Sequence, residues 1–586
     1  MKLTSTRTNA VMAEALRACR RHFGYALLFS AAVNLLFIAP MLYMLQVYDR
    51  VIPTAGGITL LLLTFVLTFS LLTLSGLDAI RSRLLVRAGV RLDRVLSGTI
   101  IDATLVRPDG AGQRLARQAV REFDTLRQAL TGPAILALLD APWVPVYILI
   151  GFLIHPWIGV LALVGAGLNV MLAWQNERAT RDRLDQANSA AGRTYAEFEF
   201  TAASADVIRA LGLRRAMVQG HLADRSRMLQ LQTDASLASG GLTATSKFVR
   251  LLLQSLALGL GALLAINSLI SPGAVFASMF IIGRALAPID QLVGSWKTIV
   301  QARGAYRTLN ELLDETPPDV ALTQLPRPNG RLEVEGVAVL DPQRRPIIAN
   351  IGFAVHPGEV VAIVGPSGAG KSTLVRALAG ALIPATGTIR FDGADQSNWD
   401  PERLAEHVGF MPQDSMLFAG TVKDNISRFR NRLGEDAAAV DADTIAAAEA
   451  AGAHEMIMRL PGGYDQPIGI NGRGLSAGQA QRVALARALF RNPRYLILDE
   501  PNASLDAEGE AHLARTLEGA KARGTTILLV AHRMSVLQVV DKLMVVRDGR
   551  IALYGPRDEV LAKITPQPPQ PQPQPRVASM TPRAQV

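Results

Sequence analysis

The chain has 586 residues, of which 49% are hydrophobic and 19% are charged. This composition excludes a disordered chain, a coiled coil and a small disulfide-stabilised scaffold, and it disfavours a wholly soluble protein. Basic residues exceed acidic residues by 10, and the whole excess lies in residues 1–329. A nucleic-acid-binding surface would carry its surplus on a soluble face, so this distribution indicates membrane topology and no nucleic-acid partner. The single cysteine, Cys19, cannot form a disulfide framework, a zinc site or a cysteine-peptidase domain.

Four uncharged runs are long enough for helices that cross about 30 Å of hydrocarbon. They are residues 24–48, 58–77, 141–176 and 251–283. The first two predict one span each, whereas the last two contain turn-forming residues around Pro156 and Pro272 and predict two spans each, the third span beginning near Ala134. The sequence therefore predicts a lipid-embedded domain of six spans over residues 24–325, after a cytoplasmic segment at residues 1–23.

Basic residues flank these spans on one side. Arginine or lysine clusters precede the first span and follow the second, fourth and sixth, whereas the three opposite turns contain only Arg50 between them. The cluster after the second span consists of Arg81, Arg83, Arg87, Arg91 and Arg94. The positive-inside rule therefore predicts a cytoplasmic N-terminus. Residues 78–133 and 177–247 are too long for loops, and we expect helices that continue into the cytoplasm, with short transverse helices near residues 107–110 and 205–215.

One carboxylate, Asp140, stands at membrane depth in the run Asp140, Ala141, Pro142, Trp143. A charge at this depth is costly unless it faces the protein interior, a cavity or a partner. Two interpretations follow: Asp140 lines a cavity or kinks a helix, or it lies at interface level at the end of a span.

The hydrophobic pattern changes after a turn-rich segment at residues 326–330. Runs typical of strands then alternate with runs typical of helices. The strand-like runs are residues 331–340, 359–364, 388–392, 495–498, 525–530 and 543–547. This alternation predicts an α/β domain with a largely parallel sheet over residues 330–563. The Pro/Gln-rich residues 564–586 predict a polyproline-like or disordered tail.

A glycine-rich loop lies between an apolar run, residues 360–364, and a helix-compatible run, residues 373–382. In such a loop the backbone N–H groups surround phosphates, Lys371 reaches the β- and γ-phosphates, and Ser372 can bind Mg²⁺. The candidate nucleotide-binding residues are Gly365, Pro366, Ser367, Gly368, Ala369, Gly370, Lys371, Ser372 and Thr373.

A second element joins an apolar strand-like run, residues 495–498, to two acidic residues, Asp499 and Glu500. In a nucleotide-hydrolysing site this position places Asp499 near Mg²⁺ and lets Glu500 polarise the attacking water. Together with the loop upstream, the pair predicts an ATPase that uses Mg²⁺.

A third run lies between these two elements. It consists of Leu475, Ser476, Ala477, Gly478 and Gln479, followed by Ala480, Gln481 and Arg482. With Gln413, Asp506 and His532 in the same order along the chain, it resembles the ATP-binding-cassette (ABC) ATPases, whose signature is Leu-Ser-Gly-Gly-Gln.

The resemblance implies a homodimer in which Ser476 and Gly478 contact the γ-phosphate of ATP bound by the opposite subunit, as suits a helix N-terminus. It also implies that Gln413 senses the γ-phosphate and Mg²⁺, that His532 completes the hydrolytic site and that Asp506 belongs to the D-loop. Two positions depart from the family pattern. Ala477 replaces the first signature glycine, and Leu340 falls near the usual position of an adenine-stacking aromatic residue.

Six spans followed by one cassette resemble an ABC exporter half-transporter. Within that family the membrane half is similar to the permease–ATPases of type I secretion systems. The similarity lies in residues 41–51, 140–143 and 283–288, and in Asn502 of the run 499–506. The most similar subgroup exports proteases, lipases and surface-layer proteins, and it lacks an N-terminal peptidase-like domain. Only 23 residues precede the first predicted span here.

This resemblance implies export of a largely unfolded polypeptide with a C-terminal signal across the bacterial inner membrane. A membrane-fusion protein and an outer-membrane channel would complete the conduit. A lipid or drug exporter with the same fold remains the alternative. A membrane-anchored ATPase without transport is disfavoured, because six spans exceed what an anchor needs.

Overall fold

The computed structural model describes residues 5–105, 110–314, 316, 324–341, 343–503, 507–531 and 536–564. The chain divides into two compact units, Met1–Pro317 and Pro318–Val586. Asp506, His532, residues 107–109 of the turn predicted at 107–110 and residues 565–586 of the tail predicted at 564–586 lie outside the described residues.

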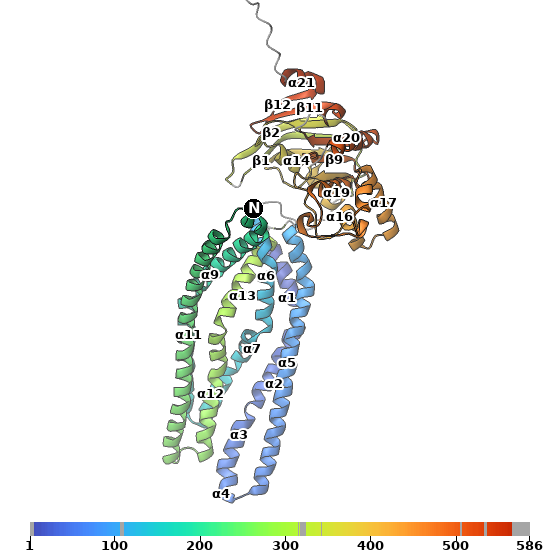
Figure 1. Ribbon diagram of the computed structural model, residues 1–586. Coiled ribbons are helices and arrows are strands. Elements are labelled where there is room, and N and C mark those ends of the chain that lie inside the picture. Colours follow the sequence, from blue (N-terminus) through green and yellow to red (C-terminus); the bar gives the residue numbers. More distant parts are fainter. Residues whose placement is uncertain are drawn as a thin grey trace, which may run out of the picture. The chain divides into compact units, whose positions relative to one another are not determined.

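The described part of the first unit is helical (Figure 1). Its α-helices are α1 (Ser5–Ala18), α2 (Arg20–Leu36), α3 (Ala39–Gln46), α4 (Ile52–Thr54), α5 (Gly57–Leu105), α6 (Gly110–Thr131), α7 (Pro133–Asp140), α8 (Val144–Ile154), α9 (Pro156–Ala203), α10 (Ala205–Ala210), α11 (Arg214–Ile266), α12 (Pro272–Gly294) and α13 (Trp296–Asp314). A π-helical turn, η1 (Val47–Val51), joins α3 to α4, and a 3₁₀ turn, η2 (Ala141–Trp143), joins α7 to α8.

Within the residues that the structure describes, six helical runs are long and apolar enough to cross a membrane. They are Arg20–Thr54, Gly57–Leu105, Pro133–Ile154, Pro156–Ala203, Arg214–Ile266 and Pro272–Gly294. This confirms the six predicted spans. The 53 residues of α11 extend about 80 Å at about 1.5 Å per residue, well beyond one hydrocarbon core. The helices therefore continue past the membrane, as the length of the intervening segments predicts.

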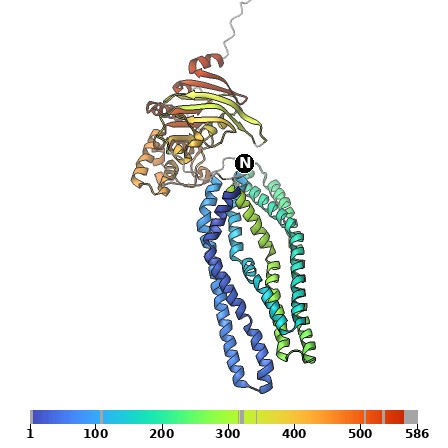
Figure 2. The same ribbon diagram turned by 180° about the vertical axis from the view of Figure 1, so that it is seen from behind.

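The first span is interrupted, which its uncharged run does not indicate. α2 ends at Leu36, and α3 begins at Ala39 with Pro40 in its first turn. Proline has no N–H to donate, so it fits the first turn of a helix better than the interior. Figure 2 shows α2 and α3 running beside α5.

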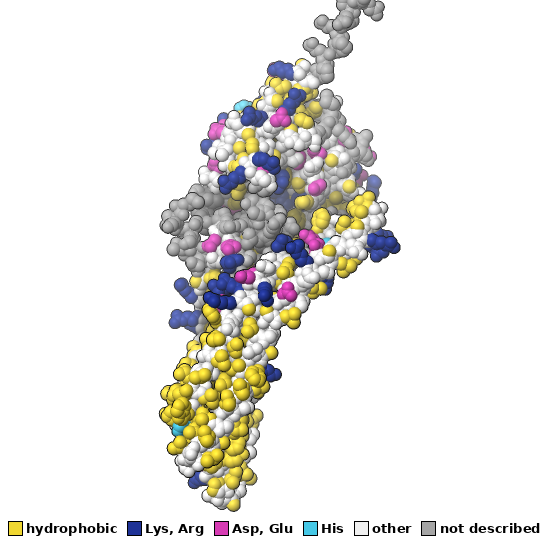
Figure 3. Space-filling model, turned by 90° about the vertical axis from the view of Figure 1, so that its left-hand side faces the viewer, with side chains coloured by type: hydrophobic (Ala, Val, Ile, Leu, Met, Phe, Trp, Pro, Cys, Tyr) yellow, Lys and Arg dark blue, Asp and Glu magenta, His cyan; other side chains and the backbone are white. Residues whose placement is uncertain are grey.

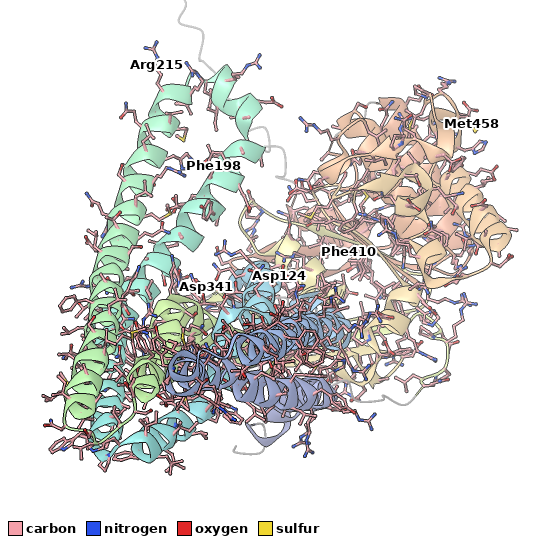
Figure 4. The ribbon with its side chains drawn as sticks, turned by 90° about the horizontal axis from the view of Figure 1, so that it is seen from below. Asp124, Phe198, Arg215, Asp341, Phe410 and Met458 are labelled. Atoms are coloured by element: carbon pink, nitrogen blue, oxygen red, sulfur yellow. The ribbon has the colours of Figure 1, made fainter. Side chains whose placement is uncertain are left out.

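The short helix α10 connects the C-terminal end of α9 to the N-terminal end of α11, in the region where a transverse helix was expected. Beside it, His221 Nε2 on α11 lies 2.8 Å from Thr201 Oγ1 on α9, and the His221 ring stands edge-on to Phe198. Figure 4 labels Phe198 on α9 and Arg215 on α11, on two neighbouring helices. These contacts hold the two long helices together at this end.

Hydrophobic and basic side chains separate along the first unit. On the face that Figure 3 shows, hydrophobic side chains cover one end of the helices, and lysine and arginine side chains gather toward the other end. An apolar band of this kind suits lipid tails, and the basic end suits the headgroup region and the water beyond it.

The second unit contains a six-stranded sheet in the order β12-β11-β3-β10-β9-β6 and a four-stranded sheet in the order β2-β1-β4-β5. The strands of the larger sheet are β3 (Val360–Val364), β6 (Val408–Met411), β9 (Tyr495–Asp499), β10 (Thr526–Val530), β11 (Lys542–Arg547) and β12 (Arg550–Pro556). Those of the smaller are β1 (Leu332–Leu340), β2 (Pro346–Val355), β4 (Thr386–Phe391) and β5 (Ala394–Asp395). A short pair, β7 (Gly420–Thr421) and β8 (Pro467–Ile468), lies apart.

Helices surround these sheets. They are α14 (Lys371–Leu378), α15 (Pro401–His407), α16 (Val422–Ile426), α17 (Ala437–Ala450), α18 (His454–Met458), α19 (Ala477–Leu489), α20 (Ala507–Ala522) and α21 (Arg557–Ile564). Short 3₁₀ turns, such as η7 (Val536–Val539), connect some of them.

The larger sheet is buried on both faces. In β3, Val360 and Ala362 pack into one hydrophobic cluster, whereas Val361 and Ile363 pack into the other. A strand covered on both faces reads as a continuous apolar run, and this is why the central strands can be predicted from the sequence. All strand pairs in this sheet are parallel except β11 with the edge strand β12, which confirms the largely parallel sheet.

The smaller sheet is antiparallel throughout, and sequence analysis did not predict it. Its strand β2 was missed because it alternates between buried and exposed residues and contains two residues of low strand propensity, Asn350 and Gly352. Strands β6 and β12 were also missed, since one has only four residues and the other mixes glycine, proline and arginine with apolar residues.

Candidate functional site

The phosphate loop lies between β3 and α14. Two parallel strands, β10 and β11, flank β3, so the loop leaves the carboxyl edge of the sheet near its centre, where α/β proteins bind ligands. The loop turns into α14 at Gly370, whose φ of 93° is left-handed. A Cβ added there would lie 2.6 Å from the Ile348 side chain, so both the conformation and the space require glycine.

Lys371 is the first residue of α14 and is only 6% exposed. Its Nζ donates hydrogen bonds to the carbonyl oxygens of Gly365 (3.0 Å) and Pro366 (2.9 Å), so the ammonium group lies over the loop. Pro366, Ser367 and Gly368 are exposed at the tip of the loop. An anion placed over the loop would meet this positive charge and the free N–H groups at the start of α14.

The structure brings Ser372 and Asp499 together. The Ser372 hydroxyl donates to Asp499 Oδ1 at 3.2 Å, although the two residues lie 127 positions apart. Asp499 ends β9 and is 2% exposed. Burial raises the pKa of this carboxyl group, whereas the hydrogen bond from Ser372 and the positive charge of Lys371 act in the opposite direction. A hydroxyl and a carboxylate are hard oxygen ligands, the kind that Mg²⁺ prefers.

Glu500 and Gln413 also meet. Gln413 follows β6, Glu500 follows β9, and the Gln413 amide donates to Glu500 Oε2 at 3.1 Å. Because β6 and β9 are adjacent parallel strands, their carboxyl ends deliver both side chains to one edge of the sheet. Glu500 has a φ of 52°, a left-handed backbone that costs a residue with a side chain about 1–2 kcal/mol. Its carbonyl oxygen accepts a hydrogen bond from the Ala503 N–H at 3.2 Å.

The run from Leu475 to Gln479 forms the start of α19. Ser476 caps this helix: its hydroxyl accepts from the Gln479 N–H at 3.3 Å, and Gln479 Oε1 accepts from the Ser476 N–H at 2.9 Å. The side chains of Ser476 and Ala477 are exposed. The N-terminus of α19 is therefore a fixed, accessible group of N–H donors at the protein surface.

Asp140 lies in the interior of the first unit. It is 7% exposed and stands where α7 gives way to η2, so it marks a break in the third span. Its Oδ1 accepts hydrogen bonds from Asn34 Nδ2 (2.7 Å), from Arg81 Nη1 (2.7 Å) and from the Ser30 hydroxyl. The carboxylate is thus paired with an arginine on α5 and held by two polar side chains on α2.

Arg81 differs from the other four arginines of the cluster that follows the second span, all of which are exposed. It is buried, at 5% exposed, and it bridges Asp140 and the half-exposed Asp78, whose Oδ1 is 2.7 Å from Arg81 Nη2. Tyr147 extends the network, since its hydroxyl donates to the Asn34 carbonyl oxygen at 2.8 Å. The sequence does carry one signal for this network, because Ser30 and Asn34 stand four residues apart in an otherwise apolar helix.

A second polar group links α9, α11 and α12. The Ser246 hydroxyl lies 2.7 Å from Asn169 Oδ1 and 2.6 Å from Asp290 Oδ1, and Arg250 Nε is 2.6 Å from Asp290 Oδ2. This ion pair is more exposed than that of Arg81, since its side chains are 30% and 18% accessible.

The sequence is similar to known proteins over both units. Residues 348–503 match the family model described as ABC transporter. The chain is 39% identical to the type I secretion system ATP-binding protein PrsD of Rhizobium meliloti, over 96% of each chain. It is 30% identical to the cyclolysin secretion/processing ATP-binding protein CyaB of Bordetella pertussis, over 93% of this chain and 76% of that protein. The chain belongs to the ABC transporters of type I secretion systems.

A solved structure agrees with this family. It is described as a bacterial Atm1-family ABC exporter with ATP bound, and it matches with a TM-score of 0.78 and 25% identity, over 93% of this chain and 96% of that chain. This confirms the predicted exporter fold, in which a domain of six spans is followed by an ABC ATPase. Transport-coupled ATP hydrolysis is the activity of the family, and the multi-pass membrane character follows from the same match.

The two departures from the family pattern are both at accessible positions. Ala477 is exposed at the start of α19, and the Leu340 side chain is 41% exposed at the end of β1. A leucine near the usual adenine position offers apolar contact but lacks the flat face on which an aromatic ring would stack. The roles predicted for Asp506 and His532 concern residues outside the described part of the chain.

Proposed function

We propose that the protein is the inner-membrane ATPase of a type I secretion system and exports a largely unfolded polypeptide that carries a C-terminal signal. The observation that carries this proposal is the 39% identity to a type I secretion system ATP-binding protein, which extends over the membrane half as well as the cassette. Other relatives are named for the secretion of cyclolysin and the translocation of alpha-hemolysin. These names favour a polypeptide substrate over a lipid or a drug.

In the proposed ATP site, Gly365 to Thr373 surround the phosphates and Lys371 neutralises the β- and γ-phosphates. Ser372 and Asp499, 3.2 Å apart, supply the hydroxyl and carboxylate oxygens for Mg²⁺, and Gln413 adds an amide oxygen. The bound Mg²⁺ would stabilise the charge that develops on the phosphates. Glu500 polarises the attacking water, and the 3.1 Å contact with Gln413 keeps its carboxylate at the same edge of the sheet.

The proposed working unit is a homodimer. Each chain provides one phosphate loop and one signature. Ser476 and Ala477 are exposed at the start of α19, where a phosphate of the ATP bound by a second chain could bind. Ser476 and Gly478 would act on the ATP of the opposite subunit, Asp506 would lie between the cassettes, and His532 would complete the site. ATP would close the cassette pair and hydrolysis would reset it, since differential binding to two states is what couples them.

We also propose that the N-terminus and the cassette face the cytoplasm, because the basic end of the first unit then lies on the cytoplasmic side (Figure 3). A membrane-fusion protein and an outer-membrane channel would then complete the conduit from the opposite face. The turn η1, which carries Arg50 between the first two spans, would lie on that opposite face.

The experiment that tests this function is ATP hydrolysis by the purified protein in lipid nanodiscs. One set of samples would receive the C-terminal segment of a secreted protein encoded beside the transporter. Separate samples would receive phospholipids or amphipathic drugs. The Glu500→Gln variant would serve as the blank for ATP hydrolysis. A saturable response of ATP turnover to the peptide alone is the expected result. A response to lipid or drug alone would leave the ATPase in place and overturn the assignment to protein secretion.

A further inference from the structure

The backbone at Glu500 needs support from its surroundings. Its φ of 52° is left-handed, and a residue with a side chain keeps such a conformation only where neighbouring groups hold it. Glu500 is also the residue whose carboxylate must be aimed at a water molecule for hydrolysis. The contacts that hold the segment directly after Glu500 therefore affect the direction in which its carboxylate points.

One side chain holds that segment from outside. Gln481, on α19, is 4% exposed, and its Nε2 donates a hydrogen bond of 2.6 Å to the carbonyl oxygen of Pro501. Pro501 follows Glu500 directly and is buried. Because proline has no N–H to donate, the backbone of Pro501 is held through its carbonyl oxygen and its ring. The Gln481 amide thus fixes the plane of the peptide that begins one residue after the left-handed turn.

We propose that Gln481 is a positioning residue for ATP hydrolysis, which holds the Pro501 carbonyl so that Glu500 keeps the backbone that aims its carboxylate. Gln481 acts through Glu500 and does not touch the nucleotide. This inference rests on the proposed role of Glu500 as the residue that polarises the attacking water.

The same helix also reaches the loop that carries Gln413. Arg487 Nη1, in the last turn of α19, donates to the Met416 carbonyl oxygen at 2.7 Å, three residues after Gln413. α19 therefore contacts the segments of both residues that meet at 3.1 Å, Gln413 and Glu500. Because its N-terminus is the signature, α19 connects the surface proposed to bind the other subunit's ATP with the hydrolytic carboxylate of its own subunit.

The position of Gln481 predicts which kinetic constant changes. The phosphate loop is built from β3 and α14, whereas Gln481 supports the segment after β9. Loss of its amide should therefore leave ATP affinity intact and reduce turnover. A displacement of about 1 Å at a reacting group can lower a rate by about a hundredfold, so we expect a decrease in kcat of about tenfold to a hundredfold.

The test uses the full-length protein in nanodiscs and four variants. Gln481→Met keeps an unbranched side chain of similar length without a donor, and Gln481→Asn keeps the amide on a shorter arm. Glu500→Gln and the double variant Gln481→Met/Glu500→Gln complete a cycle. The matched control is Gln396→Met. The Gln396 amide also donates to backbone carbonyl oxygens, those of Ala377 and Leu378, but these lie at the C-terminal end of α14, away from the phosphate loop.

For Gln481→Met we expect the decrease in kcat with the KM for ATP within twofold of wild type, an intermediate kcat for Gln481→Asn and no change for Gln396→Met. In the Glu500→Gln background Gln481→Met should have no further effect, because residues that act as a unit are not additive. An equal loss in both backgrounds, or wild-type kcat in Gln481→Met, overturns the inference. If Gln481→Met does not fold, wild-type kcat in Gln481→Asn overturns it as well. Persistent turnover in Glu500→Gln alone would instead overturn the proposed role of Glu500.

Discussion

The two units of this protein place polar groups in different ways. In the ATPase unit, each element of the site is a short contiguous run attached to a strand end or a helix start, as Gly365 to Thr373 and Asp499 to Glu500 are. In the membrane unit, the network around Asp140 is assembled from residues far apart in the sequence that lie on different helices, including Asn34 on α2 and Arg81 on α5. The first arrangement serves chemistry on a ligand, and the second satisfies a charge that lipid cannot solvate.

This comparison predicts a separation of effects. Substitutions in the ATPase site should change turnover or ATP affinity and leave the stability of the membrane unit unchanged. Substitutions in the Asp140 network should lower stability and leave the chemical step unchanged. A substitution that changes both ATP turnover and the stability of the membrane unit to a similar extent would weaken the distinction between the two units.

The largest effect is expected for Glu500→Gln. Glutamine has the same shape but cannot accept a proton from water, so turnover should fall by roughly 10²–10⁴-fold, the usual contribution of a general base. ATP affinity should be retained, because Lys371 and the phosphate loop are unchanged. Steady-state hydrolysis and equilibrium binding of labelled ATP, measured on the same nanodisc sample, check both parts. Near-wild-type turnover would show that another residue polarises the water.

Breaking the Arg81–Asp140 pair is the corresponding test in the membrane unit. Arg81→Gln leaves the Asp140 carboxylate buried with only Ser30 and Asn34 as donors, so we expect a loss of about 3–5 kcal/mol in the free energy of unfolding. Asp140→Asn should cost less, because Arg81 keeps Asp78 as a partner at 2.7 Å. Denaturant titration of the purified protein in detergent micelles measures both values.

The double variant Arg81→Gln/Asp140→Asn sharpens this prediction. It contains no buried carboxylate at position 140, and Asp78, which loses Arg81, is half-exposed, so the double variant should be more stable than Arg81→Gln alone. Arg250→Gln is the matched control, since it breaks an ion pair of 2.6 Å whose side chains are more exposed, and it should cost less than Arg81→Gln. If the double variant is no more stable than Arg81→Gln, the network is held by packing and the charges contribute little.

How far the sequence predicts each unit follows from the same difference. Six spans, the phosphate loop, the two acidic residues at the end of β9 and the signature are local patterns, and each was found from its own run of residues. The meeting of Gln413 with Glu500 depends on β6 lying beside β9, and β6 was too short to predict. Arg81 was grouped with the four other arginines that follow the second span, because their spacing gives no sign of which one turns inward. Its partner, Asp140, lies 59 positions away, and only the helix packing brings the two together.

A third effect separates binding from chemistry within the ATPase unit. Lys371→Ala removes the ammonium group that lies over the phosphate loop, and a hydrogen bond to a charged group contributes about 1.5–3 kcal/mol. ATP affinity should therefore fall by about tenfold to a hundredfold. Binding of labelled ATP in the Glu500→Gln background measures this without hydrolysis. Unchanged affinity would place the phosphates elsewhere.

The smallest effect is expected for a part-buried polar contact of the membrane unit that contains no ion pair. Asp49, in the π-helical turn before α4, caps the start of α12: its Oδ1 accepts from the Gly273 N–H at 2.7 Å, and its Oδ2 accepts from the Ser271 hydroxyl. Asp49→Ala removes a cap and a negative charge at a helix N-terminus, so it should cost about 1 kcal/mol of stability. Asp49→Asn keeps an acceptor for the Gly273 N–H and should cost less, and ATP turnover should not change in either variant. Denaturant titration beside Arg81→Gln places the two effects on one scale. A loss as large as that of Arg81→Gln would mean that a part-buried carboxylate held by two hydrogen bonds matters as much as a buried ion pair, and the expected order of effects within the membrane unit would not hold.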